Sequence, residues 1–149
     1  MKRLIYLLVL LGLIALLSAC GGGSSQNADA VKQGEVAGEK VKVTGGAYTD
    51  VDVAELQSML ANKDFTFVNV HIPFEGDIAN TDVSIPYDQI EQNLSLLPPE
   101  KDAKIVLYCR SDRMSNIAAE TLVGLGYTNV YNLKGGMVAW ERAGLPLVK

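Results

Sequence analysis

The 149-residue chain is poor in the residues that build cysteine frameworks and metal sites, with only two cysteines, Cys20 and Cys109, and one histidine, His71. Two cysteines are too few for a disulfide scaffold or for a zinc site with paired CxxC motifs. Basic residues are also scarce, since 13 Lys and Arg stand against 17 Asp and Glu. A nucleic-acid-binding protein would carry a basic stripe, so we expect no nucleic-acid partner. We also expect no metal and no cofactor.

The composition is that of one folded domain. Hydrophobic residues make up 48% of the chain, which is too high a share for a disordered protein. The length suits a single core, because domains typically hold roughly 100–200 residues. We therefore expect one domain, and a monomer.

The first twenty residues have the order of a bacterial targeting segment. Lys2 and Arg3 precede an apolar stretch over residues 4–17, which is short for a membrane span of about 20 residues. The tetrad that ends at Cys20, LSAC, resembles the bacterial lipobox. This resemblance implies a lipoprotein signal peptide over residues 1–19, cut before Cys20, whose thiol is then acylated, with palmitate among the chains. An uncleaved anchor and a plain secretory signal are the alternatives.

A flexible tether is predicted to follow the lipidated cysteine, over residues 20–43. The stretch 21–47 holds seven of the 14 glycines and no aromatic residue, leucine or isoleucine, so it cannot bury enough apolar surface to order itself. A short strand at 41–43 would end the tether, and the domain would occupy 44–149. The lipid would hold this domain on the extracytoplasmic side of the cell membrane or outer membrane.

Strand and helix patterns alternate along the domain. Asp52 and Glu55 have the spacing of a capping box and predict a helix to Ala61. The Pro98-Pro99 pair ends a second helix that Asp88 would cap. Further patterns predict strands at 65–70, 83–85, 104–108 and 129–133, and helices at 88–96, 114–125 and 136–143. Such alternation predicts an α/β sandwich with a mainly parallel sheet.

Cys109 follows the apolar run 104–108 and precedes a helix, which places it at the carboxyl end of a central strand. Ligands bind at this edge of open α/β sheets. The backbone N–H groups of such a turn form an anion cradle, and with two arginines they favour a thiolate. A small buried core cysteine is the alternative. The predicted cradle consists of Arg110, Ser111, Asp112, Arg113, Met114 and Ser115.

The segment 108–115, YCRSDRMS, resembles the active-site loop of the rhodanese family, and 126–136, GYTNVYNLKGG, resembles its C-terminal block. The resemblance covers about residues 44–149. It implies a rhodanese-like three-layer sandwich in which helices flank the sheet and Gly135 and Gly136 allow close backbone approach beneath the loop. It also implies that Cys109 is the nucleophile of a sulfurtransferase, carrying sulfur from a thiosulfate-like donor to a thiol or cyanide acceptor.

This sequence departs from the family pattern at several positions. Asp112 stands where glycine is usual, so we expect it to disfavour the thiolate and donor binding relative to glycine. Met114 stands where arginine is common, and the common Asp-Val-Arg at 69–71 reads Asn-Val-His. These changes leave open a second reading, a rhodanese-like binding module without turnover. A phosphatase would need arginine at position 115, which is serine.

Three other polar residues near the predicted strand ends are ambiguous. His71 could pair with Cys109, although a structural role in place of the family's arginine is the favoured interpretation. Glu75 and Asp77 are interpreted as solvated loop residues rather than an acid–base pair.

Overall fold

The computed structural model describes residues 37–149. The predicted signal peptide, Cys20 and the larger part of the predicted tether lie outside the described residues and stay predictions. Within the described residues, no helix combines the length and apolar character needed to cross a membrane.

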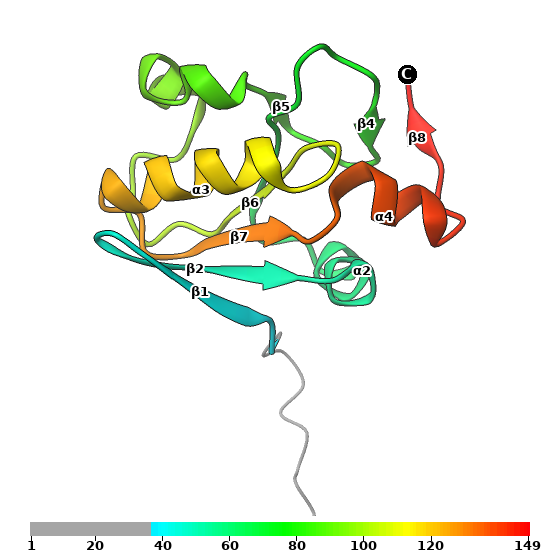
Figure 1. Ribbon diagram of the computed structural model, residues 1–149, viewed down its shortest axis with the longest axis horizontal. Coiled ribbons are helices and arrows are strands. Elements are labelled where there is room, and N and C mark those ends of the chain that lie inside the picture. Colours follow the sequence, from blue (N-terminus) through cyan, green and yellow to red (C-terminus); the bar gives the residue numbers. More distant parts are fainter. Residues whose placement is uncertain (1–36) are drawn as a thin grey trace, which may run out of the picture. The chain divides into compact units, whose positions relative to one another are not determined.

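A six-stranded sheet forms the centre of the domain, in the order β1-β2-β7-β6-β3-β5 (Figure 1). The first two strands pair antiparallel and every other neighbouring pair is parallel, which confirms the mainly parallel sheet. The strands are β1 (Glu39–Val43), β2 (Gly46–Val51), β3 (Thr66–Asn69), β5 (Val83–Ser84), β6 (Ile105–Tyr108) and β7 (Val130–Leu133).

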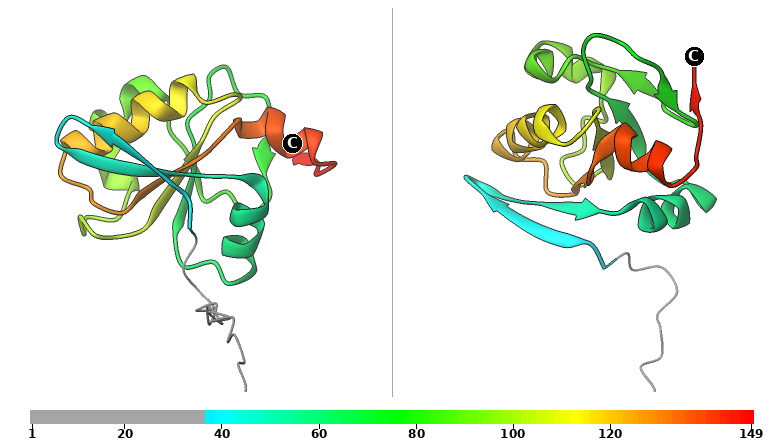
Figure 2. Two further views of the ribbon diagram at one scale, coloured as in Figure 1. Left: turned by 60° about the horizontal axis from the view of Figure 1, so that its bottom comes forward. Right: turned by 45° about the vertical axis from the view of Figure 1, so that its right-hand side comes forward.

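Helices cover both faces of this sheet. On one face lie α3 (Arg113–Gly124) and two 3₁₀-helices, η1 (Tyr87–Gln89) and η2 (Glu91–Leu96), while α2 (Val53–Ala61) lies on the other (Figures 1 and 2). The core of the second face also includes side chains of α4 (Gly136–Arg142). Alternate residues of β6 supply the two cores, because successive side chains of a strand point to opposite faces. The predicted three-layer sandwich is confirmed.

The first helix forms as its capping signal predicts. The Glu55 backbone N–H donates to Asp52 Oδ1 at 2.8 Å, and the Asp52 N–H donates to Glu55 Oε2 at 2.8 Å. This reciprocal capping box satisfies two donors that a helix start would otherwise leave unpaired, and the helix ends at Ala61 as expected.

The folded domain begins earlier than residue 44. Strand β1 starts at Glu39 and pairs with β2 in continuous register down to the Val43–Gly46 turn. Val41 and Val43 pack against the core, so residues 39–43 belong to the sheet rather than to the predicted tether. Two valines with a partner strand bury enough surface to order a segment whose other three residues are charged.

The predicted α-helix at 88–96 is wrong. The segment forms η1 and η2 instead, with Asp88 inside η1 and no side-chain cap. Asn93 has φ −118° and ψ 23°, and its Nδ2 donates to the Gln89 carbonyl oxygen at 2.8 Å. Asparagine side chains compete in this way with the backbone bonds of a regular helix.

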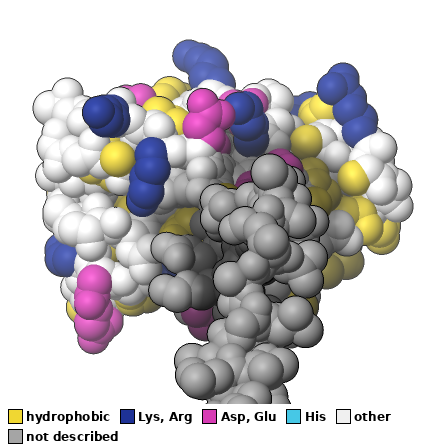
Figure 3. All heavy atoms as spheres, turned by 90° about the horizontal axis from the view of Figure 1, so that it is seen from below, with side chains coloured by type: hydrophobic (Ala, Val, Ile, Leu, Met, Phe, Trp, Pro, Cys, Tyr) yellow, Lys and Arg dark blue, Asp and Glu magenta, His cyan; other side chains and the backbone are white. Residues whose placement is uncertain are grey.

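A small two-stranded sheet, β4 (Asp77–Ile78) with β8 (Leu147–Val148), was not indicated by the sequence. Where the described residues are visible in Figure 3, lysine and arginine side chains stand apart from one another.

Candidate active site

Cys109 directly follows β6, which lies between β7 and β3, so its position at the carboxyl end of a central strand is as predicted. The thiol is free and the residue is only 2% exposed. The loop from Arg110 to Asp112 then leads into α3, which begins at Arg113. The thiol is therefore buried at the point where β6 passes into this loop.

The loop presents backbone N–H groups to an anion. Among the described residues, none of the N–H groups of 110–115 donates to another group of the protein. The carbonyl oxygens of Cys109 and Arg110, in contrast, accept from Met137 N at 2.9 Å and Val138 N at 3.0 Å. Because C=O and N–H of a trans peptide point in opposite directions, these bonds to α4 turn the first N–H groups of the loop away from α4. Free, aligned N–H groups are the requirement for an anion cradle.

Gly136 allows α4 to approach this closely. Its φ is +53°, and a Cβ there would lie 2.2 Å from the Cys109 carbonyl oxygen. No side chain fits at that distance, so the expected close approach beneath the loop is confirmed at this glycine.

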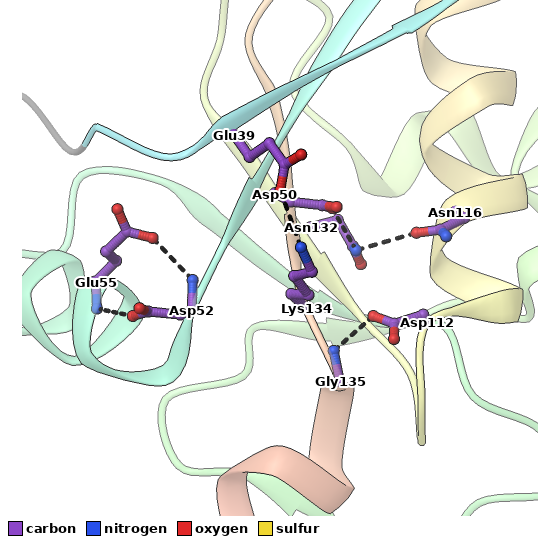
Figure 4. Close-up of polar contacts among 9 residues, drawn as sticks. All are labelled: Glu39, Asp50, Asp52, Glu55, Asp112, Asn116, Asn132, Lys134 and Gly135. Atoms are coloured by element: carbon purple, nitrogen blue, oxygen red, sulfur yellow. Dashed lines mark hydrogen bonds and ion pairs between the residues drawn. The ribbon is translucent and has the colours of Figure 1, made fainter.

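Asp112 links the loop to Gly135, the residue just before α4. It adopts φ +95°, a region that favours glycine, and its Oδ1 accepts from the Gly135 N–H at 2.5 Å (Figure 4). From the sequence, Asp112 is expected to be a member of the cradle whose charge disfavours the thiolate. The structure adds a positioning role, since the carboxylate fastens the loop where glycine would leave it free.

Ser115 is a predicted cradle residue whose side chain contacts the thiol. Its Oγ is 3.4 Å from Cys109 Sγ and 3.0 Å from the Asp112 carbonyl oxygen, and the residue is fully buried. One hydroxyl proton serves only one acceptor at a time, so it can turn to the sulfur when charge develops there. Met114 packs against the core, and Ser111 is exposed.

The two loop arginines differ in their surroundings. Arg110 forms an ion pair with Glu75, whose other carboxylate oxygen lies 3.6 Å from His71 Nε2. Arg113 is exposed and makes no ion pair within the described residues. Glu75 is exposed and lies in a loop, as interpreted from the sequence, and its ion pair with Arg110 also places it at the edge of the predicted cradle.

A buried network fixes the loop that carries Glu75. Asn69 Nδ2 donates to the Gly76 carbonyl oxygen at 3.0 Å and to Asp77 Oδ1 at 2.9 Å. The Tyr108 hydroxyl also donates to Asp77 Oδ1, at 3.0 Å. Burial raises the pKa of this hydroxyl well above its usual range, so it stays protonated. Asp77 is half-buried at the start of β4 and accepts from both the Asn69 and Tyr108 side chains, which corrects its interpretation as a solvated loop residue.

His71 is enclosed but weakly partnered. Its side chain is 6% exposed, and its ring nitrogens have no hydrogen-bond partner among the described residues. Among the described residues no hydrogen bond joins His71 to Cys109, and the role of His71 stays a prediction.

A second polar cluster, for which the sequence carries no local signal, holds the start of α3. Asn132 Nδ2 donates to Asp50 Oδ1 at 2.8 Å and to Asn116 Oδ1 at 3.0 Å (Figure 4). These three residues come from β7, β2 and α3, and only the fold brings them together. Within residues 37–149 no group of three His, Cys, Asp or Glu side chains is arranged to hold a metal ion.

Comparison with known proteins agrees with this architecture. Residues 52–143 match the family model described as "Rhodanese-like domain". A sulfurtransferase of Allochromatium vinosum is 36% identical over 103 residues, covering 66% of this chain and 94% of that protein. The crystal structure of a rhodanese-related protein from Thermoplasma volcanium shares 32% identity with a TM-score of 0.58, covering 68% of this chain and 98% of that one.

A tRNA uridine(34) hydroxylase of Erwinia tasmaniensis is also similar, at 31% identity over 112 residues, but the match spans only 31% of that protein. The shared part is therefore one domain of a larger enzyme. Since the family model covers more than half of this chain and the sulfurtransferase is matched over nearly its whole length, the chain belongs to the rhodanese-like domain family.

Proposed function

We propose that this protein is a sulfurtransferase that carries a sulfane sulfur on Cys109. The observation that carries the proposal is the free thiol at the floor of a loop whose N–H groups, from Arg110 to Ser115, have no acceptor within the described residues. Such a loop stabilises a thiolate and, equally, the anionic persulfide that replaces it. The sulfurtransferase relative supports the same reaction class.

Transfer from a thiosulfate-like donor takes two displacements. The Cys109 thiolate attacks the outer sulfur of the donor, a new S–S bond forms, and the donor's own S–S bond breaks. Sulfite leaves with that electron pair, and the cysteine becomes a persulfide anion. A thiolate or cyanide then attacks the terminal sulfur, and the Cys109 thiolate is regenerated with the electron pair of the broken S–S bond.

The loop side chains assist the charged groups of this cycle. Arg113, which has no ion-pair partner among residues 37–149, is free to attract the anionic donor. The Ser115 hydroxyl, 3.4 Å from the sulfur, is placed to donate to the thiolate.

We further propose that the protein is tethered through an acylated Cys20, with the domain on the extracytoplasmic side of the cell membrane or outer membrane. The support is the order of basic residues, apolar stretch and LSAC tetrad in the sequence. One acyl chain binds a membrane only weakly, so the multiple acylation implied by the lipobox is what makes the attachment stable.

The test is the intact mass of the purified protein after incubation with thiosulfate. The wild type should gain the mass of one sulfur atom and lose it again on addition of cyanide, with thiocyanate as product. Cys109→Ser should gain nothing while unfolding as cooperatively as the wild type. A wild-type protein that acquires no sulfur from any sulfane donor would favour the second reading, a rhodanese-like binding module, for which the occupied Arg110 is the supporting observation.

A further inference from the structure

We propose that Glu75 determines donor specificity by charge, so that the site prefers sulfane donors with a single negative charge over doubly charged ones. This inference rests on the proposed sulfur transfer and concerns the same site. Glu75 lies outside the loop that the family resemblance identifies, and it acts through its ion pair with Arg110.

The backbone beside Glu75 is held in place. The next residue, Gly76, is buried, and its carbonyl oxygen accepts from Asn69 Nδ2 at 3.0 Å. Asp77, one residue further on, begins β4 and accepts from Tyr108. The carboxylate is therefore presented to Arg110 from an anchored segment, and the pair requires little additional ordering. Its side chains are 51% and 38% exposed, so an incoming anion meets both charges.

The side-chain charges around the thiol sum to a negative value, so they do not attract a doubly charged anion. Arg110 and Arg113 supply two positive charges, which Glu75 and Asp112 cancel, and the Cys109 thiolate leaves the site at −1. Lys134, a further cation drawn with Asp112 in Figure 4, is already paired with Glu39 at 2.9 Å. Coulomb energy is linear in the donor's charge. A net negative site therefore opposes thiosulfate twice as strongly as it opposes a monoanion.

Replacing Glu75 by glutamine makes this proportionality measurable. The substitution keeps the size of the side chain and its acceptor oxygen, and it removes one negative charge beside Arg110. We expect kcat/KM for persulfide formation to rise about fivefold with thiosulfate but only about twofold with methanethiosulfonate, a monoanionic sulfane donor. In both reactions the outer sulfur is transferred, and sulfite or methanesulfinate leaves with the electron pair.

Glu100→Gln is the matched control. It makes the same change in net charge, but Glu100 lies in the loop before β6, at the end of the sheet opposite to Cys109, and is exposed. The full-length wild type and both variants are compared with each donor at low and at high ionic strength. The Glu75→Gln effect should shrink at high salt, because salt screens exposed charges, and Glu100→Gln should leave both rates unchanged.

Equal fold-changes for the two donors, or the same change in Glu100→Gln, would overturn the specificity role of Glu75 while leaving sulfur transfer established. A rate unchanged in Glu75→Gln with both donors would overturn it as well. If the wild type forms a persulfide with neither donor, the proposed function and this inference both fail. Thermal unfolding of Glu75→Gln checks that the fold survives, and Glu75→Asp, which keeps the charge, should retain most of the wild-type preference.

Discussion

Asp112 offers the sharpest test of how the loop is held, because its charge and its hydrogen bond can be removed separately. Asp112→Asn removes the charge and keeps an oxygen that can accept from the Gly135 N–H. Asp112→Ala removes both and keeps a Cβ at φ +95°. Asp112→Gly removes both and also relieves the backbone conformation. The three variants therefore separate charge, hydrogen bond and strain.

The expected magnitudes follow from the contact. A hydrogen bond to a charged group contributes about 1.5–3 kcal/mol, and the partial exposure of Asp112 favours the lower end. Asp112→Ala should then lower the free energy of unfolding by about 1.5 kcal/mol. Asp112→Gly should lower it by about 0.5–1 kcal/mol, since relief of the positive φ offsets part of the loss. Asp112→Asn should cost about 0.5 kcal/mol.

Urea unfolding and single-turnover persulfide formation with thiosulfate are the two assays. Asp112→Asn should react a few times faster than the wild type, because one opposing charge is gone while the cradle stays in place. Asp112→Ala should react more slowly. The positioning role is refuted if Asn destabilises the protein as much as Ala does. If Asp112→Gly and Asp112→Ala both react faster than the wild type, the Asp112 charge governs the rate and the hydrogen bond to Gly135 does not.

Three further predictions concern other parts of the molecule. Gly136→Ala places a Cβ 2.2 Å from the Cys109 carbonyl oxygen; it should cost about 3 kcal/mol or more in urea unfolding and slow persulfide formation, and a wild-type midpoint would contradict this packing argument. Tyr108→Phe leaves the buried Ile78 N–H without its 3.0 Å acceptor; it should cost about 1–3 kcal/mol, and a neutral result would show that another group replaces the hydroxyl. Cys20→Ser should move the protein from the membrane fraction to the soluble or unprocessed fraction; a wild type found soluble, with its signal removed elsewhere, would disprove the lipid anchor.

Much of the fold could be predicted because its signals are local. The Asp52 and Glu55 capping box depends on residues three apart and formed as expected. The α-helix predicted at 88–96 does not form. The prediction did not consider the Asn93 side chain, whose Nδ2 donates to the Gln89 carbonyl oxygen. Strands β4 and β8 have two residues each, too few for any alternation to be recognised.

The loop around Cys109 could be located from the sequence, but the sequence did not show which of its arginines forms an ion pair. Both arginines look equivalent in the segment that follows the cysteine. Only the fold brings Glu75, 35 positions before Arg110, to one of them and leaves Arg113 without such a partner among the described residues. Pairings between distant segments depend on sheet order and loop path, which residue spacing does not encode.

The departure from the family pattern at residue 69 leaves a side chain that still takes part in a hydrogen-bond network. Where the family commonly has aspartate, Asn69 has no carboxylate, and the sequence suggests a weakened brace. In the structure the Asn69 amide donates to Asp77 Oδ1 at 2.9 Å, while its own oxygen accepts from the His71 N–H at 2.9 Å. Asp77 then accepts from Tyr108 at the end of the strand that leads into Cys109. With asparagine at position 69, the Asp77 carboxylate therefore links this loop to β6, the strand that leads into Cys109.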